Sequence, residues 1–208
     1  AKLTATQAAK VSVLDGIQNV LPYGVPEGLQ RGSSNLVDAY KKCELEEGNL
    51  GIFALSAIIS DKAEPSEALK ANVVWSIGLD DPKVLLCAKQ LAAFQTGGAV
   101  TTETDIKAER GAYFVQSDFD LDAGETRDWM FATNLGQSIR SVVQLKDDLR
   151  KPEALKQKVL QDIDEGSQRL IELVAASDGL QLTADRRRNI RHFANTMFNV
   201  MRGGIFDE

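Results

Sequence analysis

The stretch ETRDWMFATNLGQSIRSVVQLKDDL, residues 125–149, contains the change in hydrophobic period that decides the fold. Before Gly136, Trp129 and Phe131 alternate with polar neighbours, which is the two-residue period of a half-buried strand. After Gly136 the period becomes 3.6, and Ser138 is placed to cap a helix. The sequence therefore predicts strands before this point and helices after it.

Upstream of this stretch, apolar runs and turn residues predict further strands. The pair 34–43 and 50–59 is predicted to be a hairpin because Gly48-Asn49 lies between its members. Residues 84–94 are predicted to be a strand, although their spacing also suits a short helix. An Asp- and Gly-rich turn is predicted at 120–124. The complete set of predicted strands is 11–20, 34–43, 50–59, 68–79, 84–94, 111–115 and 125–133.

Short antiparallel strands with turns between them favour two packed sheets. The predicted fold class is α+β, with an antiparallel β-sandwich domain in residues 1–135 followed by C-terminal helices in residues 136–208. In the second helix, which Pro152 opens, a stripe of apolar residues is predicted to pack inward. That stripe consists of Leu155, Val159, Ile163, Leu170 and Val174.

The third helix is predicted to follow the stop signal Asp178-Gly179, with Thr183 as its N-cap and Gly203-Gly204 at its end. It is apolar over a wide arc, so we expect it to need a large surface to pack against. The apolar residues are Ile190, Phe193, Ala194, Met197, Phe198 and Met201.

Composition and charge exclude several classes of protein. With 208 residues, 43% hydrophobic and 26% charged, the chain can bury a core. Its net charge of -6 disfavours nucleic acid as a partner, and the basic run 186–188 is interpreted as a solvated helix face. The longest apolar stretch, 50–59, is too short to span a bilayer, so no membrane partner is predicted and a cytoplasmic location is expected.

Few residues suggest metal or acid–base chemistry. Cys43 and Cys87 lie in predicted strands and are interpreted as small buried hydrophobes, while a disulfide between them stays open. His192 is the only histidine, which excludes a His-pair metal site, and we expect it on a helix face. Asp118, Asp120 and Asp122 are interpreted as a solvated turn because the glycine and glutamate of a calcium loop are missing. No metal, cofactor or catalytic residue is predicted.

The candidate ligand-binding residues are Asn199 and Arg202, near the end of the third helix. Gly203-Gly204 lets a backbone approach a ligand, with Arg202 as donor to an anion or hydroxyl, although helix termination also explains the glycines. Trp75 and Trp129 can stack on sugar rings, but alternation with polar neighbours favours core positions.

Three passages carry a resemblance to a known family: residues 50–56 with 67–70, residues 119–136, and residues 178–199. Their order resembles the N-terminal super-sandwich domain and helical linker of glycoside hydrolase family 94 and related inverting disaccharide phosphorylases. In that family a galactose mutarotase-like sandwich leads through linker helices into an (α/α)6 catalytic barrel. The catalytic acid and the phosphate-binding groups lie in that barrel, and this chain ends about where it would begin.

The resemblance implies a non-catalytic domain that supports the barrel, helps the enzyme form a homodimer and contributes loops to a carbohydrate pocket. A stand-alone carbohydrate-binding β-sandwich module is the alternative, and it predicts exposed aromatic residues on one sheet face. A mutarotase-like sugar epimerase is a third interpretation. It needs paired acid and base groups, usually with histidine, whereas His192 lies outside the predicted strands.

Overall fold

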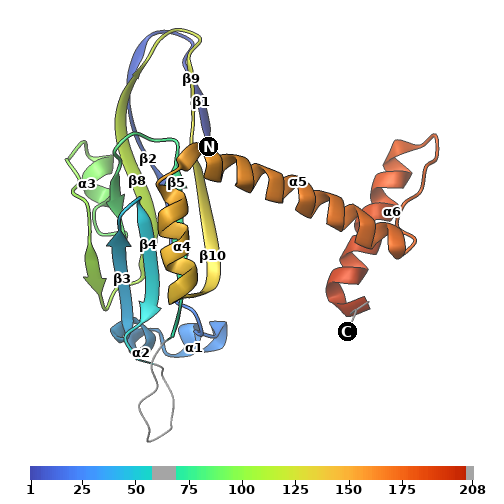
Figure 1. Cartoon of the computed structure of the whole chain (residues 1–208), viewed down its shortest axis with the longest axis horizontal. Coiled ribbons are helices and arrows are strands. Elements are labelled where there is room, and N and C mark those ends of the chain that lie inside the picture. Colours follow the sequence, from blue (N-terminus) through green and yellow to red (C-terminus); the bar gives the residue numbers. More distant parts are fainter. Residues whose placement is uncertain (58–68, 205–208) are drawn as a thin grey trace, which may run out of the picture. The chain divides into compact units, whose positions relative to one another are not determined.

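The strands in the described residues, 1–57 and 69–204, form three antiparallel sheets, and helices follow them, so the chain is α+β (Figure 1). In this computed structural model the chain divides into two compact units, Ala1–Pro152 and Glu153–Glu208. The first contains the sheets and the second contains most of the helical residues. Residues 58–68 lie outside the description, and with them the ends of two predicted strands, at 58–59 and 68, and part of the passage 67–70.

The five-stranded sheet has the order β10-β5-β4-β3-β7. At its centre β3 and β4 form a hairpin at the predicted turn, with Glu46 opposite Leu50, although β3 begins seven residues later than the predicted strand. Gly48 and Asn49 both have positive φ angles, +78° and +59°, so the turn uses the residue types that tolerate this conformation. The strands are β3 (Lys41–Glu46), β4 (Leu50–Leu55), β5 (Lys70–Ile77), β7 (Asp105–Lys107) and β10 (Met130–Ser138).

The three-stranded sheet has the order β2-β8-β6, and a separate pair joins β1 to β9. β2 and β8 run side by side over most of their length (Figure 1). Gly16 of β2 faces Phe114 of β8 so closely that an added Cβ would collide with the β8 backbone. The strands are β1 (Lys2–Thr4), β2 (Ala9–Val20), β6 (Lys83–Leu85), β8 (Gly111–Leu121) and β9 (Thr126–Asp128).

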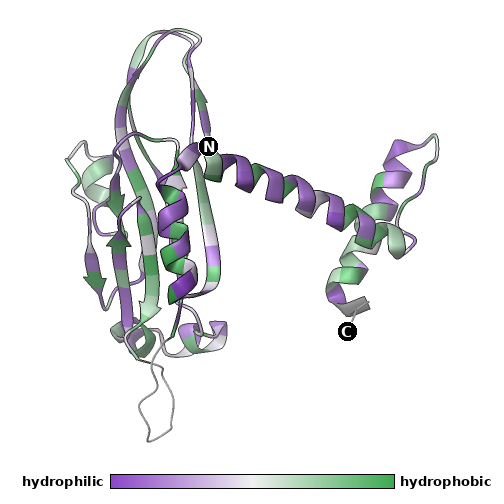
Figure 2. Ribbon diagram, in the orientation of Figure 1, coloured by the Kyte–Doolittle hydropathy of each residue, from purple (hydrophilic) through white to green (hydrophobic). Residues whose placement is uncertain are grey.

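One hydrophobic core takes side chains from both larger sheets, and in Figure 2 hydrophobic segments mark the central strands. Phe53 and Val74 contribute from the five-stranded sheet, and Tyr113 and Val115 from the three-stranded sheet. β5 is buried on both faces from Val74 to Ile77, so the predicted burial of one face only was wrong. Val74 lies on the face that joins the core, and Trp75, on the opposite face, is buried as well.

Some predicted strands were wrong in part. The first six residues of 34–43 form helix α2 (Ser34–Ala39), which follows α1 (Glu27–Gly32). Of the segment predicted as a strand at 84–94, only the first two residues lie in β6; a bend and a turn follow, and α3 (Leu91–Gln95) begins at Leu91, so the strand prediction was wrong for most of the segment. The segment predicted as one strand at 125–133 is two strands, β9 and β10, separated by Trp129.

The helices after the sheets mostly begin where predicted. Ser138 caps α4 (Ile139–Leu149), its Oγ accepting a hydrogen bond from the Ser141 N–H at 3.3 Å. Pro152 opens α5 (Pro152–Ala176), which is largely hydrophilic in Figure 2 and is buried only at Leu155 and Val174. Ile163 and Leu170, in the stripe that was predicted to pack inward, are exposed, so that prediction was wrong for these residues. α4 belongs to the first compact unit, whereas the role of residues 136–208 as a linker stays a prediction.

The turn after α5 stops the helix as predicted, but the cap of the next helix differs. Asp178 has φ +57°, and the Gly179 N–H donates to the Val174 carbonyl at 2.8 Å. α6 (Arg186–Asn199) is capped by Asp185, not by Thr183, because only the Asp185 carboxylate reaches the first free N–H groups. α6 continues into the π-helix η1 (Val200–Gly204). No helix of the described residues has the length and apolarity that crossing a bilayer requires.

Candidate functional site

The predicted ligand residues lie at one helix end. Asn199 is the last residue of α6, and Arg202 lies one turn later in η1. Both are exposed, and the Arg202 guanidinium stacks on the Phe198 ring, 5.4 Å from its centroid. The electron-rich face of the ring attracts the guanidinium, so the cation rests on an aromatic surface. A ligand role for the two residues stays a prediction.

His192 links α6 to the turn that precedes it. Its Nε2 lies 2.7 Å from the carbonyl oxygen of Asp178, so this nitrogen carries the proton and donates it. The ring is half-buried rather than freely exposed. The contact gives His192 a positioning role at the corner between α5 and α6.

The aspartates of the predicted turn belong mainly to a strand. Asp118 and Asp120 are part of β8, because that strand continues to Leu121 opposite β2. Asp118 accepts a hydrogen bond from Gln116 Nε2 at 2.8 Å. Hydrogen bonds from Ser12 and Gln116 lower its pKa. In the described residues no group of three or more His, Cys, Asp or Glu side chains is arranged to hold a metal ion.

Both tryptophans are core residues, as predicted. Trp75 and Trp129 are 2% and 6% exposed. Their indole N–H groups donate to Asn134 Oδ1 at 2.9 Å and to Asp15 Oδ2 at 2.8 Å. Neither ring presents a face on which a sugar can stack.

The two cysteines are buried and unpaired. Cys43 lies in β3 as predicted, whereas Cys87 lies in a bend after β6, so its predicted strand position was wrong. Burial raises the pKa of Cys43 to about 12 and also raises the pKa of Cys87. Both thiols are therefore protonated at neutral pH and are poor nucleophiles.

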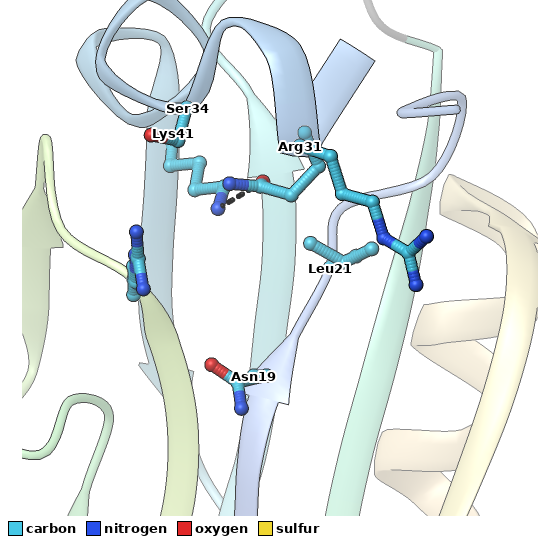
Figure 3. Close-up of a pocket in the computed structure, with 7 residues that line it drawn as sticks. Asn19, Leu21, Arg31, Ser34 and Lys41 are labelled. Atoms are coloured by element: carbon cyan, nitrogen blue, oxygen red, sulfur yellow. Dashed lines mark hydrogen bonds between the residues drawn. The ribbon is translucent and has the colours of Figure 1, made fainter. Parts of the chain in front are cut away.

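A pocket of about 320 Å³ lies where α1 and α2 meet the end of β2 and the start of β3. Figure 3 shows Lys41 reaching toward Gln30, with Asn19 near the end of β2, Leu21 just beyond that strand, and Arg31 extending past Leu21. Six of the seven lining residues have polar or basic side chains, and Leu21 is the apolar one. The lining residues are Asn19, Leu21, Gln30, Arg31, Ser34, Lys41 and Arg110.

Lys41 is the buried cation of this pocket, with only 2% of its side chain exposed. Its Nζ donates to Gln30 Oε1 and to Asp38 Oδ1, both at 2.8 Å, and Arg110 Nε lies 3.5 Å from Asp38 Oδ2. Burial alone raises the pKa of Asp38, but the hydrogen bond and charge of Lys41, with the hydrogen bond from Arg110, outweigh it and leave that pKa low. The carboxylate is thus ionised at neutral pH and holds both cations.

Asn19 enters the pocket from a β-bulge. The register of β2 against β8 shifts between Gln18 and Val20, and Asn19 between them has φ +58°. Asparagine tolerates this left-handed conformation better than most residues, and a bulge redirects the side chain that it contains. The bulge therefore places a side-chain amide at the pocket.

None of the pocket residues was predicted as a site from the sequence. One signal was present: Lys41 lies two residues before Cys43, so in a strand both side chains share a face. A lysine on the same face as a buried cysteine is expected to need a carboxylate partner. Asn19 and Arg110 carry no such local signal, because only the folded chain brings them to Lys41.

In comparisons with known proteins, no protein family model matches the chain, and the search of curated proteins finds no match.

Proposed function

We propose that the chain is the non-catalytic N-terminal domain and helical linker of a carbohydrate-active enzyme, a glycoside phosphorylase or hydrolase. In this proposal the sheets form a galactose mutarotase-like super-sandwich, and the helices lead to an (α/α)6 catalytic barrel. The domain supports the barrel and the homodimer of a cytoplasmic enzyme. Two buried, unpaired cysteines support a reducing compartment.

The observation that carries the proposal is the exposed apolar surface of the last helices. Met201 is 76% exposed, Ile190 and Phe198 are exposed by more than half, and Leu182, in the segment before α6, is 99% exposed. Burial of such side chains contributes about 1.5–3 kcal/mol each, so their exposure supports a surface that another part of a protein covers. A barrel that follows the linker provides that cover.

The arrangement of the first compact unit gives further support. Its two larger antiparallel sheets share one core, and α4 follows the last strand directly, which matches the strand-then-helix order that the resemblance implies. An alternative, a stand-alone carbohydrate-binding module, needs exposed aromatic rings on a sheet face. The burial of Trp75 and Trp129 removes its predicted platform.

The genomic reading frame provides the most direct test. We expect it to continue beyond the codon for Glu208 into repeated amphipathic helices that carry a catalytic carboxylic acid. A stop codon immediately after Glu208 would contradict the proposal.

Assays of the purified 208-residue chain provide a second test. We expect no turnover of β-linked glucose disaccharides, with or without inorganic phosphate, while an active disaccharide phosphorylase serves as positive control. Release of glucose or of a sugar phosphate by this chain would contradict its non-catalytic assignment. Binding to several glycans on an array would instead favour the carbohydrate-binding module.

A further inference from the structure

Several hydrogen-bond donors in the pocket beside Lys41 have no acceptor among the pocket residues. The Lys41 ammonium has three N–H groups, of which two bind Gln30 and Asp38. Within the described residues no third acceptor contacts it. The side chains of Asn19 and Ser34 form no hydrogen bond with another described residue either, and each can donate to a ligand.

Two arginines add further donors at the rim. Arg31 pairs with Glu27 through Nη2 at 2.6 Å, and its side chain is 79% exposed. Arg110 uses its Nε on Asp38 at 3.5 Å and is 65% exposed. A guanidinium has five N–H donors, so most of those on both arginines are available to a bound molecule. Long exposed side chains of this kind can close on a ligand without moving the backbone.

The charge balance of the pocket selects an anion. Three cations, Arg31, Lys41 and Arg110, stand against the two carboxylates of Glu27 and Asp38, which leaves one positive charge. The chain as a whole has a net charge of -6, so this is a local reversal of sign. A concave site with excess positive charge concentrates anions.

We infer that this pocket binds a phosphate monoester of a small polar molecule. A phosphate group presents three terminal acceptor oxygens, and the free donors come from separate directions: Lys41 from β3, Arg110 from the segment before β8, and Asn19 from the bulge. A carboxylate presents only two oxygens in one plane. Leu21 offers an apolar surface for the carbon skeleton, and about 320 Å³ suits a small ligand.

This binding does not depend on the proposed barrel. All the residues that carry it lie in the compact unit Ala1–Pro152, so the 208-residue chain contains the whole pocket. The two proposals can therefore be tested independently. Absence of phosphate binding would not contradict the proposed function, and evidence against the proposed function would not affect the test of the pocket.

Titration of the chain with glycerol 3-phosphate tests the inference, with glycerol and glycerate as matched ligands. We expect glycerol 3-phosphate to bind with a Kd of about 1 mM or tighter by calorimetry. The NMR signals of the Nε–Hε groups of Arg31 and Arg110 should shift during the titration. Glycerol should not bind, and glycerate should bind about tenfold more weakly because it offers fewer acceptors. Equal affinity for glycerate and glycerol 3-phosphate overturns the assignment to phosphate.

Variants at the rim test whether binding occurs at this pocket. Arg31→Gln and Arg110→Gln should each weaken glycerol 3-phosphate binding about tenfold through loss of a charge-assisted hydrogen bond. Arg169→Gln is the matched control, because Arg169 is 78% exposed and forms the same i,i+4 ion pair, with Glu165 on α5. It should bind as the unmodified chain does. Unchanged affinity in both pocket variants, or an equal loss in Arg169→Gln, overturns the inference.

Discussion

Trp129 donates a hydrogen bond of 2.8 Å from its indole Nε1 to Oδ2 of Asp15, a residue 114 positions earlier in the chain. The second carboxylate oxygen of Asp15 accepts the N–H of Gly16, also at 2.8 Å. The Trp129 ring packs against Phe119 in an edge-to-face arrangement, with 6.5 Å between the centroids. This set of contacts joins β2 to the short segment between β9 and β10, and it leaves the buried indole with a satisfied donor.

Replacement of Asp15 should show how much that hydrogen bond contributes to the free energy of unfolding. We expect Asp15→Ala to lower the free energy of unfolding by about 1–3 kcal/mol, because the buried Trp129 N–H then has no acceptor. Asp15→Asn keeps an acceptor oxygen and should lose less. Urea unfolding followed by tryptophan fluorescence measures both, and equal losses in the two variants would show that the acceptor is not what stabilises this corner.

The close approach of β2 and β8 makes Gly16 sensitive to any side chain. A Cβ there would overlap the Tyr113 carbonyl oxygen and lie 2.7 Å from the Phe114 Cα, both of which are backbone atoms. We expect Gly16→Ala to destabilise the chain by about 1–3 kcal/mol, seen as a lower Tm. Gly28→Ala is the control, since no atom lies within 4 Å of a Cβ at that helical position. A Tm for Gly16→Ala equal to that of the control would argue against this strand contact.

The Lys41–Asp38 ion pair should make stability depend on pH at the acid end. The pKa of Asp38 in the folded chain is below its ordinary value of 3.8. The contribution of the pair is therefore complete above about pH 4 and is lost as the pH falls through the lower, folded pKa.

Asp38→Asn leaves the buried Lys41 without its charged partner and should lower the free energy of unfolding by about 3 kcal/mol at pH 7. The difference in free energy of unfolding between this variant and the unmodified chain should become smaller below about pH 4. Asp105→Asn, which breaks the exposed pair with Lys107, should change stability by less than about 1 kcal/mol. Chemical denaturation between pH 3 and pH 7 provides the measurement. A free-energy difference that stays constant over that range would contradict the assigned titration of Asp38.

The buried thiols should resist modification in the folded chain. Burial raises the pKa of Cys43 to about 12, so almost none of it is thiolate at pH 8. We expect a thiol-specific reagent to label neither Cys43 nor Cys87 under native conditions and to label both in urea. Rapid labelling of one thiol in the folded protein would show that the structure around it unfolds locally.

Local features were predictable from the sequence where neighbouring residues alone determine them. The β3–β4 hairpin follows from Gly48-Asn49 between two apolar runs, and α4 follows from Ser138 ahead of a 3.6-residue period. Each depends on hydrogen bonds within a few residues. By contrast, β8 extends to Leu121 because Ala9 pairs with it, and that partner lies too far away in the chain to be recognised locally.

The helix at 34–39 shows how tertiary packing overrides a weak pattern. Its imperfect alternation predicted a strand, but α2 buries Val37 completely and turns Asp38 toward Lys41. Burial of one apolar side chain and pairing of one buried charge outweigh the small difference in local propensity.

The sequence by itself determined the order of the parts: strands, then helices, with an acidic composition and tryptophans suited to a core. Only the tertiary structure decided where positive charge collects, because Arg110 lies 72 residues from Asp38 and is brought to it by the pairing of β7 with β3, in which the Ala108 N–H donates to the Lys41 carbonyl. Hydrophobic period is a property of adjacent residues, whereas a pocket is a property of segments that meet only when the core closes.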